Sequence, residues 1–328
     1  MLNSIRSIFT NSGRNYFKSI IEKIATENGR AVGSPGHRKA REFILEFFEQ
    51  SGIEPFSTTF ELPFEVENEG FTNLVGLVKG KDSSLPAILV GAHYDTCGNQ
   101  PGADDNGAAV SILMWLVSRL KQTELLHDVI IAFFDSEEPP YFLGPKMGSK
   151  YFHRYQLNRD IHSVLVWDLV GHDVPTRGLE DILFVIGSES HPKWPEMVSK
   201  TVLPRGLRMM PSRNKYIGDK SDYHSFREDG LPYLFLTCGR WEHYHERSDT
   251  PDKLNYNKIE RVAKYSLELI IGMNAVDFQT KPLKSLDEFE IEHTMDIVKS
   301  LPGYEALRIH SAKELERFTH QFLKQHQL

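Results

Sequence analysis

The stretch HYDTCGNQPGADDNG, residues 93–107, decides the fold class that the sequence predicts. The run AILVGA (87–92) before it is typical of a buried strand, and the apolar run at 108–120 after it predicts a helix packed against a sheet. The loop between them carries one histidine and three aspartates: His93, Asp95, Asp104 and Asp105. Imidazole nitrogens and carboxylate oxygens are metal ligands, and ligand sites of α/β proteins lie at the ends of strands. The stretch therefore predicts a metal site in an α/β fold.

Length and composition narrow the class of protein. The chain has 328 residues, 40% of them hydrophobic and 25% charged, which is enough for a large globular core. A net charge of −7 argues against general binding to nucleic acids or anionic membranes, which requires basic patches. No apolar run reaches the roughly 18 residues of a membrane span. The N-terminus lacks the apolar block of a secretory signal. With only two cysteines, Cys97 and Cys238, we expect a reduced, cytoplasmic protein.

Apolar strand patterns alternate with helical patterns along the chain. We expect strands at 58–62, 73–79, 87–92, 129–134, 162–171, 182–187 and 231–237. We expect helices at 14–29, after GSPGH, and at 108–120, 146–156, 192–203, 222–229 and 256–275. This alternation predicts an α/β fold, a three-layer sandwich with a central mixed, largely parallel sheet flanked by helices.

The composition changes most sharply after Lys281. Residues 282–328 are charged and helical in pattern, with a break at Leu301-Pro302-Gly303. We predict a single domain at 1–281 and an appended helical hairpin at 282–328. The hairpin packs on the same domain or forms a partner contact, such as an oligomer interface, and an ordinary terminal extension is equally compatible with the pattern.

Polar residues follow other apolar strands of the predicted sheet. The strand at 129–134 leads to Glu137 and Glu138, the strand at 162–171 is interrupted by Asp168, and the strand at 231–237 leads to GRWEHYHERSDT. A lone buried aspartate is usually a satisfied structural residue. Polar groups at four strand ends are harder to explain in that way, because a buried carboxylate needs a cation or many donors.

Two adjacent glutamates can divide the work of metal-assisted hydrolysis. Successive side chains on extended backbone point to opposite sides, so only one member of Glu137-Glu138 faces a metal easily. The other can accept the proton of a water whose pKa the metal lowers. Two solvated surface glutamates are the alternative interpretation. Two zinc ions would be balanced in charge by Asp104, Glu138, Asp168 and a bridging hydroxide.

Six motifs in order carry a resemblance to a known family. They are HYD (93–95), GADDNGAAV (102–110), FFDSEE (133–138), VWDLVG (166–171), SDYHSF (221–226) and YHERSDTPDKL (244–254). In this order the set, which covers roughly residues 14–275, resembles the M28 zinc aminopeptidases, the bacterial leucyl-aminopeptidase-like co-catalytic metallopeptidases. Each motif alone is weak, whereas the ordered set is specific.

The resemblance implies a set of roles for the site residues. His93, Asp104 and Asp168 would bind one zinc ion, and Asp104, Glu138 and His245 the other, with Asp104 as the bridging ligand. Glu137 would be the general base. Asp95 would accept a hydrogen bond from His93. A cis peptide would follow the bridging aspartate, between Asp104 and Asp105.

Some assignments near the last motif rest on finer points. His245 is preferred to His243 because Asp249-Thr250 stand four residues after it, as in the family. Tyr244 is the candidate for polarising the scissile carbonyl, with Tyr216 and Tyr223 as competitors and a packing role equally compatible for each. We treat Cys97 as a non-ligand, since the resemblance already fills the ligand set.

This chain departs from the family in two places. It has Ser221-Asp222-Tyr223 where the sequence SDH is common in the family. The segment PPYFLGPKM (139–147) also intervenes before Gly148-Ser149. We expect this loop to form an aromatic wall that narrows specificity, although a plain surface loop is the alternative.

The resemblance predicts a di-zinc peptidase that removes N-terminal residues from a peptide or aminoacyl substrate. The alternative is a glutaminyl-cyclase-like aminoacyltransferase with a single zinc ion. A non-catalytic binding module of the same fold is a third class. Such a module would lack some of the metal-ligand residues, whereas this chain has all of those that the resemblance implies.

Overall fold

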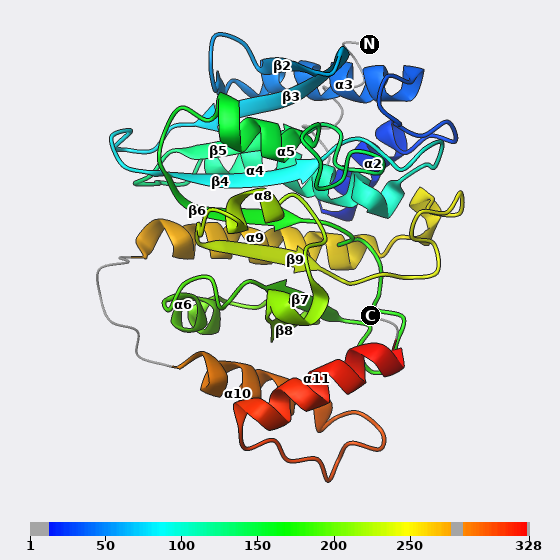
Figure 1. Ribbon diagram of the computed structural model, residues 1–328, viewed down its shortest axis with the longest axis vertical. Coiled ribbons are helices and arrows are strands. Elements are labelled where there is room, and N and C mark those ends of the chain that lie inside the picture. The colour runs from blue at the N-terminus through cyan, green and yellow to red at the C-terminus, as the bar shows by residue number, and fades with distance from the viewer. Residues whose placement is uncertain (1–12, 277–284, 327–328) are drawn as a thin grey trace.

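The structure is a computed structural model that describes residues 13–276 and 285–326. Its centre is one nine-stranded mixed sheet (Figure 1). The strands are β1 (Glu54–Pro55), β2 (Glu61–Val66), β3 (Glu69–Val78), β4 (Ala87–His93), β5 (Val129–Phe134), β6 (Ile161–Trp167), β7 (Ile182–Ile186), β8 (Arg208–Ser212) and β9 (Tyr233–Thr237). Their order in the sheet is β1-β3-β5-β4-β6-β9-β7-β8, with β2 paired to β3.

The four central strands β5, β4, β6 and β9 run parallel, whereas β3 and β7 join them in antiparallel fashion. At the centre of the register, Val90 of β4 lies opposite Ile131 of β5 and Leu165 of β6. All three side chains are fully buried. Continuous apolar sequence of this kind suits strands covered on both faces. Because the central strands are parallel, their carboxyl ends share one edge of the sheet.

Helices cover both faces of the sheet. They are α2 (Arg14–Ile24), α3 (Pro35–Ser51), α4 (Ala109–Leu120), α5 (Gly148–Tyr151), α6 (Trp194–Lys200), α7 (Asn214–Ile217), α8 (His224–Arg227), α9 (Tyr256–Ala275), α10 (Leu286–Val298) and α11 (Ala312–His326). Helices α4 and α9 lie behind the sheet in Figure 1, and α5 and α8 lie in front of it. The predicted α/β class, a mixed sheet flanked by helices, is therefore confirmed.

Local sequence explains where several helices begin and end. The Ser34 side chain accepts a hydrogen bond from the backbone N–H of His37 and caps α3. Gly52 ends that helix with a φ of 66°, a conformation that glycine adopts without steric cost. The Asn255 side chain caps α9 in the same way as Ser34 caps α3. Trp167 donates from Nε1 to the Ser266 hydroxyl at 2.8 Å and ties β6 to α9.

The structure differs from the sequence-based expectation at several elements. Helix α2 ends at Ile24 instead of residue 29, and the expected helix at 146–156 consists of the short α5 and a π-helical segment, Phe152–Gln156. The strand expected at 58–62 begins later, as β2. Strand β8 and helix α7 were not expected. Pro211 lies within β8, and proline is disfavoured in strands except at sheet edges, where β8 is found.

The C-terminal helices complete the core at the β8 end of the sheet. The predicted domain boundary after residue 281 lies outside the described residues. Helix α10 packs on β8, and α11 contacts α7 and α10 (Figure 1). Buried apolar side chains of both helices, among them Phe289, Phe318 and Phe322, belong to the same continuous core as the sheet. Within the described ranges, no helix combines the length and apolarity needed to cross a bilayer.

Candidate active site

The polar residues predicted from the strand ends meet at the carboxyl edge of the central strands. His93 is the last residue of β4, Glu137 and Glu138 follow β5, Asp168 follows β6, and His245 lies in the loop after β9. Parallel pairing places these loops side by side. All of these side chains except that of His245 are buried.

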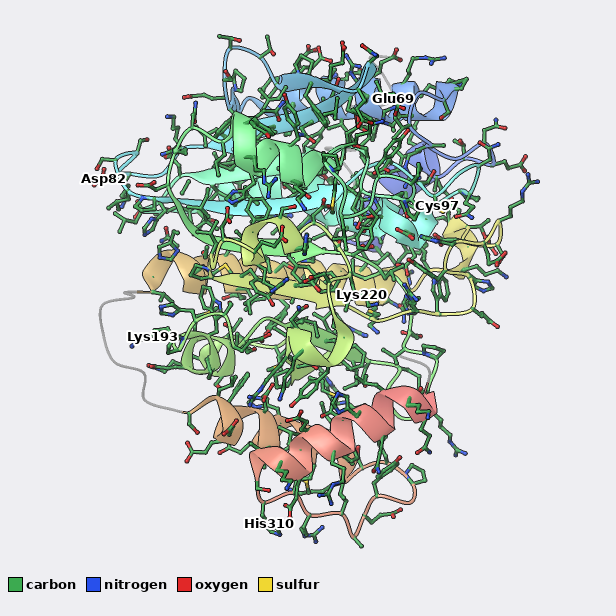
Figure 2. All side chains as sticks on the ribbon, in the orientation of Figure 1. Glu69, Asp82, Cys97, Lys193, Lys220 and His310 are labelled. Atoms are coloured by element: carbon green, nitrogen blue, oxygen red, sulfur yellow. The ribbon has the colours of Figure 1, made fainter. Side chains whose placement is uncertain are left out.

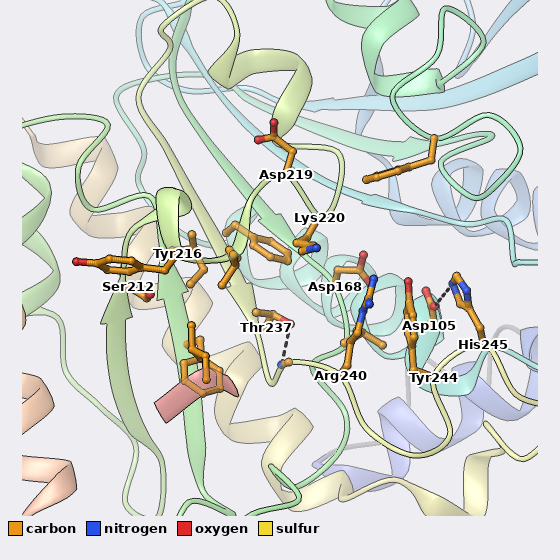
Figure 3. Close-up of a pocket in the computed structure, with 18 of the residues that line it drawn as sticks. Asp105, Asp168, Ser212, Tyr216, Asp219, Lys220, Thr237, Arg240, Tyr244 and His245 are labelled. Carbon is orange, nitrogen blue, oxygen red and sulfur yellow. Dashed lines mark hydrogen bonds and ion pairs between the residues drawn. The ribbon is translucent and has the colours of Figure 1, made fainter. Parts of the chain in front are cut away.

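Asp105 lies between the two histidines. Its Oδ1 is 3.4 Å from His93 Nε2, and its Oδ2 is 3.3 Å from His245 Nε2 (Figure 3). Asp168 Oδ2 is 3.5 Å from His93 Nε2, and Glu138 Oε2 is 3.0 Å from His245 Nε2. Two groups therefore form, His93 with Asp168 and His245 with Glu138, and the two oxygens of one carboxylate connect them.

The prediction that Asp104 is the shared ligand is wrong. Its Oδ1 accepts a hydrogen bond from Gly171 N at 2.6 Å, and its Oδ2 lies 2.5 Å from His172 Nδ1. The cis peptide is Asp105–Asn106, one residue later than predicted. The sequence alone does not distinguish the two neighbouring aspartates of GADDNG, because the backbone conformation of this segment determines which carboxylate faces the histidines. Gly171 leaves the room for Asp104, because a Cβ there would lie 2.8 Å from its Oδ1.

The choice of His245 over His243 agrees with the geometry. His243 Nδ1 lies 2.9 Å from the Ser248 hydroxyl. Asp95 also lies where the sequence placed it, with Oδ1 3.4 Å from His93 Nδ1. It has a second task that the sequence did not reveal. Its two carboxylate oxygens accept hydrogen bonds from the backbone N–H groups of Glu137 and Glu138, each at 3.1 Å.

The electrostatics of the cluster show an excess of buried negative charge. Burial, and then the negative charge of Asp105, raises the pKa of Glu138 to about 8. Burial likewise raises the pKa of Glu137 well above its usual value. Burial lowers the pKa of His93, but Glu137 and Asp168 outweigh it, so the net pKa lies well above the ordinary range. Carboxylates that retain protons beside histidines that retain theirs indicate a site short of positive charge.

The donor set fits metal ions. The buried atoms His93 Nδ1 and Nε2, His245 Nε2, Glu138 Oε1 and Asp168 Oδ1 have no hydrogen-bond partner within the described chain. Ligand atoms of His93, Asp105 and Asp168 lie within 4.8 Å of one another, as do those of Cys97, Glu138 and His245. The structure thus places the thiol of Cys97, which we predicted to be a non-ligand, beside the second group. Buried polar atoms without partners are costly unless a cation completes the site.

Two residues that the sequence interpretation missed hold the loop that carries Asp105. The buried guanidinium of Arg30 donates to the backbone carbonyls of Tyr94, Pro101 and Gly102 at 2.8, 2.6 and 3.0 Å. The Asp249 carboxylate accepts from the backbone N–H groups of the two loop aspartates, Asp104 and Asp105, at 2.9 and 3.0 Å. Asp249 lies in the SDT motif that identified His245, whereas Arg30 has no recognisable sequence signal.

A cavity of about 790 Å³ opens from this cluster. Much of its wall is apolar, with Phe142, Leu169, Phe184, Ile186 and Phe235 among the lining residues. Its charged lining residues include Lys220 and Arg240 near the cluster (Figure 3). Helix α11 supplies His320, Leu323 and Lys324 to the same wall. From the loop at 139–147, Pro139 and Phe142 line the cavity, whereas Tyr141 packs edge-on against Phe71 at 5.2 Å.

The three candidate tyrosines occupy different places. Tyr244 stacks on the His245 ring at 3.8 Å and lines the cavity beside Asp105 (Figure 3). Tyr223 is fully buried, and its hydroxyl donates to Asn214 Oδ1 at 2.7 Å. Tyr216 lines the cavity away from the acidic cluster. Of the three, Tyr244 is the one whose ring lies against a histidine of the cluster.

Fold and site together define an α/β protein with a buried histidine–carboxylate centre arranged for metal ions. Residues 73–270 match the model of peptidase family M28, more than half of the chain. The chain therefore belongs to the M28 peptidase family, and the resemblance found in the motifs is confirmed.

Curated relatives are distant in sequence. The uncharacterized protein YfbL of Escherichia coli is 27% identical over 264 residues, which cover 71% of this chain and 79% of YfbL. Human endoplasmic reticulum metallopeptidase 1 is 22% identical over 232 residues, 66% of this chain. That match spans only 24% of the human protein, and a match to a Candida glabrata vacuolar membrane protease spans 20% of that protein.

Solved structures with the same fold include a Legionella pneumophila protein and a bacterial glutaminyl cyclase. LapB from Legionella pneumophila superposes with a TM-score of 0.66 at 18% identity and covers 83% of this chain and 75% of LapB. Glutaminyl cyclase from Porphyromonas gingivalis superposes with a TM-score of 0.64 at 16% identity, over 79% of this chain and 98% of the cyclase. At such identities the likeness shows the fold alone.

Proposed function

We propose that this chain is a metallo-aminopeptidase that uses two zinc ions to hydrolyse N-terminal residues from peptides. The observation that carries the proposal is the position of Asp105, whose two oxygens face different histidines. His93, Asp105 and Asp168 would bind one ion, and Asp105, Glu138 and His245 the other. Zinc, when bound, lowers the pKa of a water molecule and polarises a carbonyl group. Two divalent ions among these three carboxylates would also relieve the excess of buried negative charge at the site.

Glu137 is the proposed proton carrier. Its side chain is buried, and its Oε2 lies 3.8 Å from His93 Nε2. Glu137 is thus beside the proposed metal ligands but is not one of them. The backbone N–H of Glu137 donates a hydrogen bond to Asp95 Oδ1, which fixes the backbone from which this side chain extends. Glu137 would accept a proton from the attacking water and deliver it to the leaving amine. Tyr244 would donate its hydroxyl hydrogen bond to the carbonyl oxygen as negative charge develops there.

The acidic end of the cavity supports an amino terminus as the part of the peptide that enters first. The carboxylates of Asp105, Glu138 and Asp168 line that end. The zinc ions that they would hold could bind and orient the lone pair of an uncharged substrate amine there. We propose in addition that the protein acts in a reducing compartment such as the cytoplasm. Both Cys97 and Cys238 are free thiols, which fits that environment.

A glutaminyl-cyclase-like aminoacyltransferase with one zinc ion is the second candidate, favoured by the fold likeness to bacterial glutaminyl cyclases. Metal content separates the two. Two zinc ions per chain support the peptidase, and one supports the cyclase. A non-catalytic binding module would bind peptides without turnover.

The decisive experiment combines metal analysis with the Glu137→Gln variant. We expect chelation to abolish hydrolysis of leucine amide and zinc to restore it. Glu137→Gln should keep its zinc and lose about 10²–10⁴-fold in kcat, because general base catalysis contributes about that much. Glu65→Gln, an exposed change on β2, is the matched control and should keep wild-type kcat. Full activity of Glu137→Gln would refute its role, and cyclisation of N-terminal glutamine without peptide hydrolysis would refute the peptidase.

A further inference from the structure

The cavity carries positive charge that the proposed reaction does not use. Lys220, Arg240 and Lys324 line it together with the acidic cluster. Among the described residues, the structure records no ion pair for any of the three. Arg240 lies over the ring of Tyr244, 4.6 Å from its centre, so its guanidinium is beside the cluster. Figure 3 shows Lys220 and Arg240 between the Asp105–His245 end of the cavity and the Tyr216 end.

The acidic residue next to Lys220 in sequence, Asp219, is already engaged. Asp219 pairs with Arg227 at 2.7 Å and with His224 at 2.9 Å. Burial, and then the positive charge of Arg240, lowers the pKa of Lys220. Two neighbouring cations in a cavity repel one another until an anion lies between them. The arrangement is therefore suited to an anionic group of a bound molecule.

Helix α11 lines the cavity next to α7. His320, Leu323 and Lys324 are its lining residues. Lys215 on α7 forms an ion pair with Glu316 at 2.7 Å, and Tyr216 packs edge-on against His320 at 5.4 Å. These contacts connect α11 to the α7 side of the cavity. A cavity of about 790 Å³ is in the usual size range for small ligands.

We propose that Lys220 and Arg240 bind a carboxylate of a short peptide substrate whose amino terminus lies at the acidic cluster. The carboxylate is the C-terminal group of a dipeptide or the side chain of an acidic second residue. Lys324 of α11, which also lines the cavity, adds further positive charge. The inference rests on the proposed function, and it narrows the substrate to short or acidic peptides with an apolar first residue, which suits the apolar wall.

The test measures equilibrium binding to the zinc-loaded Glu137→Gln protein by calorimetry. The first probe pair is leucyl-alanine and leucyl-alaninamide, which differ only in the terminal carboxylate. The second pair is leucyl-aspartic acid α-amide and leucyl-asparagine α-amide, which differ only in the side-chain carboxylate. We expect the acid of at least one pair to bind about ten-fold more tightly than its neutral partner, as a charge-assisted hydrogen bond provides. The pair that shows the preference identifies the source of the carboxylate.

Matched variants assign the preference to the cavity. Lys220→Ala should reduce the acid preference to less than about three-fold, and Arg240→Ala should do the same. Lys313→Ala removes the same charge from an exposed position of α11 that does not line the cavity, and it should keep the full preference. Equal binding of acid and neutral probes, no binding of any probe, or the same loss in Lys220→Ala and Lys313→Ala would overturn the proposal. If the wild-type protein hydrolyses none of the probes, the proposed function fails, while the binding preference is still measured independently.

Discussion

Asp104 and Asp105 are neighbours in the chain, yet their carboxylates serve different parts of the molecule. Asp105 faces both histidines, His93 and His245. Asp104 instead accepts a hydrogen bond from the backbone N–H of Gly171 and lies against Nδ1 of His172. Because the carboxylates of the two residues are chemically identical, substitution of one and then the other isolates the effect of position.

Asp105→Asn should reduce bound zinc well below that of the wild type, because the carboxylate faces both proposed metal groups. Elemental analysis of dialysed protein measures this. Asp104→Asn is the matched control and should retain its zinc while losing about 1.5–3 kcal/mol of unfolding free energy, since a hydrogen-bonded buried charge is removed. The reverse pattern, with metal lost only in Asp104→Asn, would return the bridging role to Asp104.

Most site residues were recognisable in the sequence because a polar residue at the end of an apolar strand is conspicuous. His93, Glu137, Glu138 and Asp168 were found in this way, and His245 through the motif around it. The order of side chains in a turn was not recognisable, since periodicity describes regular backbone and the loop at Asp105 is irregular, with φ −102° and ψ 87°. Arg30 was missed because its partners are backbone carbonyls far along the chain, which leave no pattern in sequence.

At the scale of elements, the strands with continuous apolar sequence were predicted in the right places, although β3 begins and β6 ends four residues before the expected positions. Strand β5 matches residues 129–134, and helix α9 matches 256–275. The failures were short or edge elements, such as β8 with its proline, where packing and not local preference determines the structure. The cavity could not be predicted, because its walls come from segments between residues 105 and 324.

His162, near the start of β6, makes the unfolding free energy of the protein depend on pH in the acidic range. The ring of His162 packs against that of His127 at 4.5 Å. Burial, and then the charge of His127, lowers the pKa of His162 from 6.5 to about 4. Between these values the unfolded chain binds the proton more readily than the folded chain does. The unfolding free energy contributed by His162 therefore decreases as the pH falls from about 6.5 to about 4.

His162→Gln should weaken this dependence. Urea unfolding at pH 7 and pH 5 should show a smaller loss of unfolding free energy in the variant than in the wild type. His310→Gln is the control, since His310 is exposed at the opposite end of the molecule from Glu69 (Figure 2), and this variant should behave as the wild type. An unchanged pH dependence in His162→Gln would exclude His162 as a source of acid sensitivity.

At the scale of the whole molecule, residues 285–326 are part of the core and of the cavity. The change of composition after residue 281 predicted helices there but could not show that α11 reaches the cavity. Phe322 is 1% exposed and packs against Phe318 at 5.2 Å, directly beside the cavity residue Leu323. An oligomer contact through this segment stays a prediction.

Phe322→Ala should lower the unfolding free energy by about 3–5 kcal/mol, the usual cost of removing a buried aromatic ring. Denaturant titration measures it. Gln321→Ala changes an exposed neighbour on the same helix and should stay within about 0.5 kcal/mol of the wild type. A negligible effect of Phe322→Ala would mean that α11 is only loosely attached.

The hydrogen bonds from the backbone of Asp104 and Asp105 to the Asp249 carboxylate affect when the site can form during protein synthesis. The proposed ligand residues span His93 to His245, and the aspartate that shapes their central loop comes four residues later. A nascent chain that has emerged only as far as α4 or β6 has ligand residues but no shaped site. If the chain binds zinc as proposed, the complete centre would form only after Asp249 has emerged, so a product that ends before this residue would lack the shaped site.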